Sequence, residues 1–366
     1  MPAPNGATCA VNGGAHRNVR PRPLASGARA VTLPVQVMTR SATTHHLPVD
    51  RRFSLMGTDV RIVVGPPARP GLAPPGAAAD AVESFLRDYD AALSRFRPDS
   101  ELSRLNADPR EVVPASPLLR SALHGALEAA ELTGGLVDPA LLDGIEAAGY
   151  RSSWEPRRRL DLRSALGEAR KHRRAARPDP RSRWRLIVVD DAAGSVRRPP
   201  GLRIDTGGTG MGHAADLAAD HLEGYAEWSV ACGGDQRVGG TAGTVRSIEV
   251  DHPFTGAPGT GVQLAAGGVA TSGLRARIWR GPTGEVAHHL LDPSIGRPVF
   301  TGLVSVTALA PRAVRAEALA KAALLSGPAG AARVLERHGG VAFDDAGVEH
   351  RYGVLAVPVR RRLRIA

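Results

Sequence analysis

Four closely spaced glycines stand in the segment 204–212, IDTGGTGMG, between a strand-like run and a helix-like run. Such glycines let backbone amides approach an anion, and the N-terminus of the following helix adds a favourable dipole. The segment could therefore bind a phosphate. It lacks the Gly-Lys-Ser/Thr ending of a Walker loop and matches the dinucleotide fingerprint poorly. By itself, the loop fits a structural turn as well as a ligand site.

Hydrophobic periodicity predicts the elements that would position this loop. Helical spacing marks residues 79–96, 117–132, the run after the glycine loop, 312–327 and 329–339. Short strand-like runs occupy residues 51–64, 185–191, 201–206, 228–240, 247–254, 261–273, 285–293 and 348–359. Because helices are scattered among antiparallel-looking strands without regular βαβ spacing, we predict an α+β fold of mixed sheets with packed helices.

Length and composition bound the organisation of the chain. Its 366 residues, 43% apolar and 23% charged, are typical of a globular protein. Residues 1–47 lack periodicity and are predicted to be a disordered tail, with one domain over 48–366. Cys9 and Cys232 are too few for a disulfide framework or a zinc site. Since no stretch reaches the roughly 20 apolar residues of a membrane span, we predict a cytoplasmic chain without one.

The net charge of +11 is concentrated in one arginine-rich segment, 151–185. Thirteen basic and four acidic residues give this segment a charge of +9, which leaves +2 for the rest of the chain. Trp154 and Trp184 flank the run and do not interleave with it, and no nucleic-acid-binding motif accompanies it. We therefore predict no specific nucleic-acid partner. A solvated basic face and a patch for a phosphate or polyanion both remain open.

Several ordered blocks resemble the ApbE family of FAD:protein FMN transferases, and together they cover about residues 51–345. The matching blocks are MGT at 56–58, LSRFRPDSELSRLN at 93–106, GLVDP at 135–139, DTGGTGMGHAAD at 205–216, ACGGD at 231–235, ATSG at 270–273 and HLLDPSIG at 289–296. The resemblance implies an ApbE-like fold. It also implies a transferase that moves FMN from FAD to a threonine of a target protein, with release of AMP.

The resemblance also implies which positions would contact FAD, the substrate. These are Met56, Phe96, Leu136, Val137, Asp138, Asp205, Met211 and Leu290. Phe96 stands where the family often has tyrosine, which keeps an aromatic face.

His289 is the candidate catalytic base, because a neutral imidazole accepts protons near physiological pH. The alternative is a histidine that only shapes the following Asp-Pro turn. The neighbouring His288 would point the opposite way in a strand, so both cannot serve one site.

The expected Mg²⁺ site departs from the family pattern. The resemblance places it at the Gly208 carbonyl and at an Asp and a Thr four residues apart, where this chain has Glu317 and Lys321. Glu317 could still reach a metal, but Lys321 is not expected to ligate one because an ammonium group has only donors. Met211 also replaces the loop lysine, and Leu274 replaces a polar residue after ATSG.

Two accounts of these changes remain open. Lys321 could supply positive charge in place of the metal or of the lost loop lysine. Alternatively, Glu317 and Lys321 could form an ion pair that closes an inactive site, leaving an FAD-binding relative without transferase activity. A third possibility is a binding module that uses the basic segment to hold an acidic partner. This possibility predicts that partner binding weakens strongly with added salt and does not change with flavin.

Overall fold

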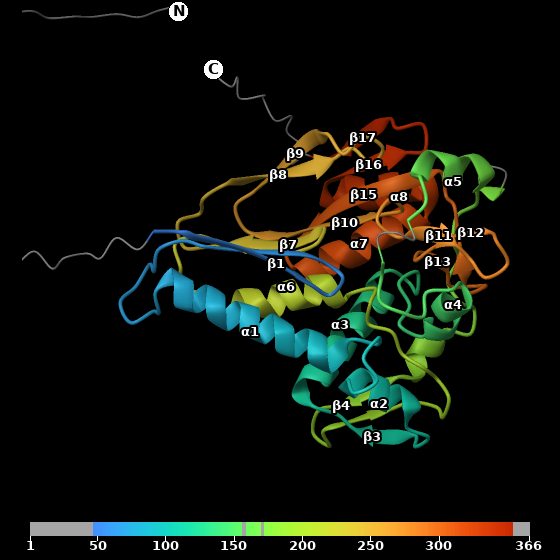
Figure 1. Cartoon of the computed structure of the whole chain (residues 1–366), viewed down its shortest axis with the longest axis horizontal. Helices are drawn as coiled ribbons and strands as arrows, with labels where there is room; N and C mark the ends of the chain where they lie inside the picture. The colour runs from blue at the N-terminus through green and yellow to red at the C-terminus, as the bar shows by residue number, and fades with distance from the viewer. Residues whose placement is uncertain (1–46, 156–158, 170–171, 354–366) are drawn as a thin grey trace, which may run out of the picture. The chain divides into compact units, whose positions relative to one another are not determined.

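An eight-stranded antiparallel sheet forms the centre of the domain in the computed structural model (Figure 1). The structure describes residues 47–155, 159–169 and 172–353, so the predicted tail lies outside them apart from Leu47. In sheet order the strands are β1 (Val49–Leu55), β2 (Thr58–Val64), β6 (Trp228–Cys232), β7 (Asp235–Gly239), β10 (Gly267–Gly273), β15 (Leu303–Ala310), β16 (Gly340–Asp344) and β17 (Glu349–Tyr352).

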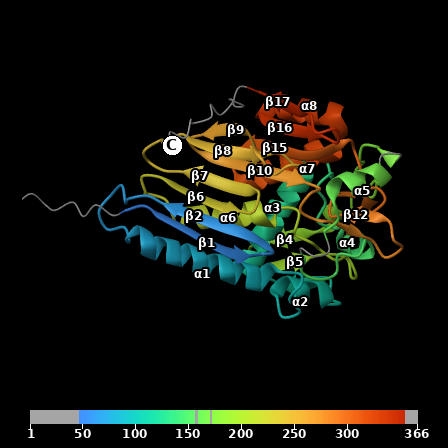
Figure 2. The same cartoon turned by 45° about the horizontal axis from the view of Figure 1, so that its top comes forward.

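A row of four helices packs along this sheet (Figure 1, Figure 2). The helices are α1 (Pro75–Leu93) against β1 and β2, α6 (Gly210–Asp220) against β6 and β7, α7 (Ala313–Leu325) against β10 and β15, and α8 (Gly327–His338) against β15 and β16. Alanines fill much of the interface, and twelve of the thirteen α7 residues are buried. Helix α7 therefore lies in the interior, and any charged residue on it needs a partner.

Four small sheets and further short helices complete the described fold. The sheets pair β3 (Val112–Pro114), β5 (Ser195–Arg197) and β4 (Val188–Asp190); β8 (Arg246–Asp251) and β9 (Pro258–Leu264); β11 (Ile278–Arg280) and β12 (Val286–His288); and β13 (Leu291–Asp292) and β14 (Arg297–Pro298). The other helices are α2 (Glu101–Ala107), α3 (Pro117–Leu132), α4 (Leu142–Ala147), α5 (Leu162–Ala169) and the 3₁₀ turn η3 (Arg183–Leu186). The α+β prediction is confirmed.

Two predicted elements need correction. Residues 201–206 form no strand; instead, the side-chain amide of Asn106 donates to the Ile204 carbonyl and accepts from the Ile204 amide, both at 2.7 Å. One side chain thus replaces a partner strand. Helix α1 ends at Leu93 rather than at residue 96, because Ser94 turns to an extended conformation. Phe96 is thereby released from the helix into a turn.

The arginine-rich segment is not uniformly solvated. Arg174 Nη2 lies 3.0 Å from the buried Asp292 carboxylate, and the Arg177 amide donates to the same side chain. The buried Asp179 pairs with both Arg181 and Arg183. Arg174 and the Arg177 amide therefore tie the C-terminal half of the segment to the domain through Asp292, whereas the Asp179 pairs lie within the segment. None of the helices in the described part of the chain is long and apolar enough to cross a membrane.

A buried histidine joins three of the helices. His213 of α6 contacts Tyr89 Oη of α1 at 3.0 Å through Nδ1 and Ser121 Oγ of α3 at 3.1 Å through Nε2. Gly125 of α3 allows this approach, since a Cβ there would lie 3.2 Å from the imidazole. Burial, followed by the charge of Arg312, lowers the pKa of His213 to about 4. The ring is therefore neutral in the folded protein.

This shift predicts a pH dependence of stability. In the unfolded chain His213 binds a proton below pH 6.5, whereas in the folded protein it does so only near pH 4. The neutral His213 therefore contributes its full stabilisation above pH 6.5, and this contribution is lost as the pH falls towards 4. The loss from this group is about 3 kcal/mol. Between pH 6.5 and 4, the free energy of unfolding of wild type should fall by about 3 kcal/mol more than that of His213→Gln, as measured by urea unfolding. Parallel stability profiles for the two proteins would contradict the assignment.

Candidate functional site

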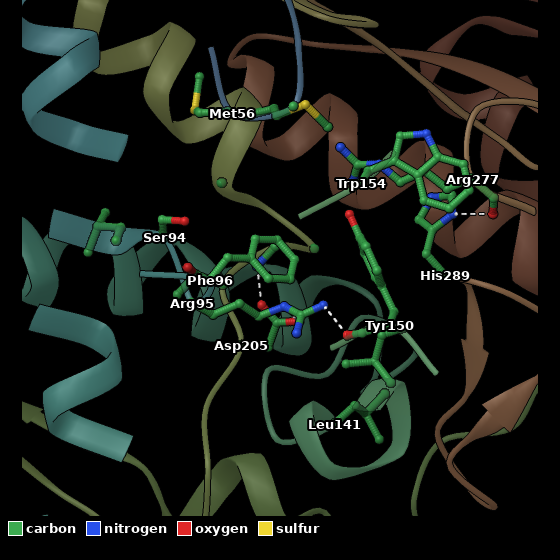
Figure 3. Close-up of a pocket in the computed structure, with 18 of the residues that line it drawn as sticks. Met56, Ser94, Arg95, Phe96, Leu141, Tyr150, Trp154, Asp205, Arg277 and His289 are labelled. Atoms are coloured by element: carbon green, nitrogen blue, oxygen red, sulfur yellow. Dashed lines mark hydrogen bonds and ion pairs between the residues drawn. The ribbon is translucent and has the colours of Figure 1, made fainter. Parts of the chain in front are cut away.

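A cavity of about 440 Å³ opens where the C-terminal end of α1, the glycine loop, α7 and the β12–β13 turn meet (Figure 3). This volume lies within the roughly 300–1,000 Å³ of small-molecule sites. Eleven of the twelve residues predicted from the sequence line it: Met56, Phe96, Leu136, Val137, Asp138, Asp205, Gly208, Met211, His289, Leu290 and Lys321. Glu317 is not among the lining residues, because it is fully buried.

Met56 reaches the cavity from a tight hairpin turn between β1 and β2. Met56 and Gly57 both have positive φ angles, 54° and 68°, as the two central residues of such a turn require. Asn or Gly usually fills the first of these positions, because other side chains are strained there. The strained methionine is consistent with a functional position on the cavity wall.

Two hydrogen bonds made by Asp205 hold the glycine loop in place. The Asp205 carboxylate accepts from the Gly207 amide at 2.9 Å, and the Asp205 amide donates to the Pro139 carbonyl at 2.8 Å. Gly212, in the first turn of α6, packs against α7 so closely that a Cβ would lie 2.6 Å from the Ala313 carbonyl oxygen. The loop amides and the N-terminus of the eleven-residue α6 therefore lie at the cavity, which suits a bound phosphate.

An aromatic wall faces the cavity and contains residues that sequence reasoning missed. Its members Phe96, Tyr150 and Trp154 line the cavity, with ring centroids 5.3 Å apart for Phe96–Tyr150 and 6.2 Å for Tyr150–Trp154. Figure 3 shows the rings of Phe96 and Tyr150 pointing into the cavity. Such a wall suits a planar ring system. The sequence signal for the missed residues was the four-residue spacing of Tyr150 and Trp154 in a chain with only 4% aromatic residues.

Arg95 holds this wall together and was also missed. Its guanidinium carbon lies 4.1 Å from the Phe96 ring centroid and 4.8 Å from that of Tyr150. It donates to the Tyr150 carbonyl at 2.9 Å, and its Nε lies 3.5 Å from Asp205 Oδ2. Arg95 thus connects the aromatic wall to the glycine loop. Sequence inspection gave Arg95 no role, although it lies inside the matched block 93–106.

His289 lies at the cavity beside Arg277, a further lining residue without an earlier prediction. The Nδ1 atom of His289 is 3.5 Å from the Arg277 carbonyl oxygen (Figure 3). Because a carbonyl only accepts, this contact favours the proton on Nδ1 and leaves Nε2 able to accept one. Burial, then the charge of Arg277, lowers the pKa of His289 well below its ordinary value. The imidazole is therefore neutral at physiological pH.

His288 points away from His289, as the sequence predicted. It is fully buried, its ring packs edge-on against Phe300 at 4.6 Å, and its Nδ1 accepts from the Leu290 amide at 3.1 Å. The turn that follows is held by Asp292, whose Oδ1 accepts from both the amide and the hydroxyl of Ser294. Only one histidine of the pair therefore faces the cavity.

Asp138 lies on the cavity wall with a perturbed carboxyl group. Burial raises its pKa to about 6, although its Oδ1 accepts from the Ala140 amide at 2.7 Å. Asp138 would therefore be partly protonated in mildly acidic solution. Its Oδ2 is buried without a hydrogen-bond partner among the described residues, so a polar ligand group could satisfy it.

The positions expected to bind Mg²⁺ do not fit a metal. Lys321 Nζ lies 2.7 Å from Glu317 Oε1, and Glu317 Oε2 accepts from the Gly212 amide at 2.8 Å. Both oxygens of Glu317 are engaged, and the ammonium group would repel a cation. Within the described ranges, no group of three or more His, Cys, Asp or Glu side chains is placed to hold a metal. That Lys321 does not ligate a metal stays a prediction.

A second buried carboxyl group, that of Asp235, lies near this pair. Burial, then the Glu317 carboxylate, raises the pKa of Asp235 well above its ordinary value. The protonated form of Asp235 is therefore favoured. The ion pair of Glu317 and Lys321 offsets charge within this buried cluster.

Comparison with known proteins places this architecture in a family. The model of the ApbE family matches residues 56–343. Among curated relatives, the FAD:protein FMN transferase of Treponema pallidum is 29% identical over 280 residues, covering 69% of this chain and 72% of the relative. That of Haemophilus influenzae is 26% identical over 276 residues, covering 70% and 75%.

Solved structures agree with this relation. The crystal structure of the ApbE protein from Thermotoga maritima superposes with a TM-score of 0.67 at 28% identity, covering 83% of this chain and 97% of that one. The flavin transferase ApbE from Vibrio cholerae shares the fold, with a TM-score of 0.63 at 21% identity. The matched region contains the glycine loop, the aromatic wall and the histidine turn described above, and the chain belongs to the ApbE family.

Proposed function

We propose that this chain is an FAD:protein FMN transferase, which moves FMN from FAD to a threonine of an acceptor protein. The observation that carries the proposal is one cavity in which a glycine loop, an aromatic wall and a neutral histidine come together. Family membership supports the same reaction. Each of the three parts has a distinct task in it.

The flavin nucleotide would bind across these parts. The aromatic wall of Phe96, Tyr150 and Trp154 offers faces on which a planar ring can stack. The glycine loop offers backbone amides to the diphosphate, whose charge Lys321 and Arg277 help to offset. The other predicted contacts are Met56, Leu136, Val137, Asp138, Asp205, Met211 and Leu290.

The reaction exchanges the phosphoanhydride bond of FAD for a phosphoester bond to the acceptor. The acceptor hydroxyl oxygen forms a bond to the FMN phosphorus, and the bond from that phosphorus to the bridging oxygen breaks. AMP leaves with the bonding electrons, and the hydroxyl proton passes to Nε2 of His289. The protein contributes positioning and charge stabilisation, which supply most of the catalysis in phosphoryl transfer.

Magnesium is not part of this proposal, because Glu317 is already paired and Lys321 cannot ligate a metal. The acceptor is a separate protein, and we place the reaction in the cytoplasm.

A second candidate, an FAD-binding relative without transferase activity, is favoured by the same ion pair. However, Lys321 still lines the cavity, so the pair does not close it. A basic protein-binding module has less support, since several arginines of the basic segment are paired.

Replacing His289 tests the transfer step. With FAD and a flavin-acceptor domain, wild type should release AMP and label the acceptor, whereas His289→Gln should be about 10²–10⁴-fold slower. FAD affinity should change less than about threefold, because the base acts on the acceptor. Because the pKa of His289 is lowered, wild-type activity should be lost only as the pH falls well below 6.5.

His288→Gln is the matched control, since His288 faces the core beside the same turn. It should keep the pH profile of wild type even if it is less stable. FAD binding without AMP release by wild type would identify the inactive relative, and unchanged transfer by His289→Gln would remove His289 as the base.

Replacing Arg95 tests the aromatic wall. Arg95→Met removes the guanidinium that contacts both rings and should weaken FAD binding about tenfold, measured by calorimetry. Arg95→Lys should not restore it, because a lysine lacks the planar group that stacks on both rings. Arg104→Met, an exposed arginine of the same block, is the control and should bind FAD as wild type does. Full affinity in Arg95→Lys would contradict the stacking role.

A further inference from the structure

Lys321 is an unusual choice of cation for this chain. Only Lys171 and Lys321 are lysines among 47 basic residues, the others being arginines. Lys321 lies on the buried helix α7, its side chain is 11% exposed, and it lines the cavity together with Gly208 and His289. A lysine presents a compact point charge where the guanidinium of an arginine would need more space. The position therefore fits a small, localised positive charge.

A rigid connection fixes this ammonium group relative to the glycine loop. Glu317, one turn earlier on α7, holds Lys321 Nζ at 2.7 Å and the Gly212 amide at 2.8 Å. Since Glu317 is fully buried, water cannot compete for these bonds. The carboxylate therefore fixes the ammonium group of Lys321 relative to the first turn of α6, next to the glycine loop. Among the described residues, Glu317 is the one acceptor bonded to the ammonium, which leaves further N–H donors for a ligand.

We propose that the Lys321–Glu317 pair takes the place of a divalent cation in this protein. Lys321 donates to the diphosphate oxygens of the flavin nucleotide, and binding and transfer proceed without Mg²⁺. The inference rests on the proposed function, because it assumes that the cavity receives FAD. It also explains why both oxygens of Glu317 are used within the protein.

Calorimetry tests the inference with three ligands. Wild type should bind FAD and ADP equally well in EDTA and in MgCl₂, with Kd values within about twofold. Glu317→Gln combined with Lys321→Met removes both charges without leaving a buried carboxylate unpaired, and should weaken FAD and ADP binding at least tenfold. Riboflavin has no phosphate, so its affinity should be unchanged in this variant, which controls for folding. Undiminished FAD binding by the double variant would overturn the proposal.

Lysine-selective ¹⁵N NMR gives a direct readout of the ammonium group. The Lys171→Arg variant leaves one lysine, so the Lys321 Nζ signal is assigned without further labelling. It should shift on addition of FAD or ADP and stay unchanged with MgCl₂, and paramagnetic Mn²⁺ should not broaden it selectively. Selective broadening by Mn²⁺ would place a metal beside Lys321 and overturn the proposal.

The assays also separate this inference from the proposed function. If wild type binds no FAD with or without Mg²⁺, the proposed function fails. If FAD binds and AMP is released only with Mg²⁺, the proposed function stands and the metal-free role of Lys321 is wrong. Release of AMP in EDTA, lost in the double variant, supports both.

Discussion

The buried Glu317 carboxylate is the constraint on which the site depends. It joins Lys321 on α7 to the Gly212 amide at the start of α6, so it sets the position of the ammonium group relative to the glycine loop. A buried charge of this kind is tolerated only when its partners are present, and removing one partner costs about 3–5 kcal/mol. The close packing of Gly212 on Ala313 adds a steric constraint at the same contact. Electrostatics and packing therefore hold α6 and α7 in one arrangement.

A second buried carboxylate gives the arginine-rich segment a structural role. Asp292 accepts from Ser294 in its own turn and from the Arg177 amide, and it pairs with Arg174. The turn that presents His289 is thus held from outside by the basic segment. Arg174 of the basic segment therefore has a structural role at the site.

Much of the site followed from the sequence because its residues lie in short contiguous blocks. The glycine spacing in 205–212, the alternation of His288 and His289, and the four-residue spacing of Glu317 and Lys321 are all local patterns. The long helices were predicted because their apolar faces repeat every three to four residues. The supposed strand at 201–206 was wrong because a side chain, Asn106, supplies its hydrogen bonds.

The sequence by itself determined the fold class, the family resemblance and the residue types at the cavity, since each depends on local pattern and block order. Only the tertiary structure decided that Arg95 lies over the rings of both Phe96 and Tyr150, that His289 faces the cavity beside Arg277, and that both Glu317 oxygens are engaged. The contacts of His289 with Arg277, of Arg95 with Tyr150 and of Glu317 with Gly212 join residues 12, 55 and 105 positions apart. Burial and long-range contact set the charge state of a side chain, and a linear pattern carries neither.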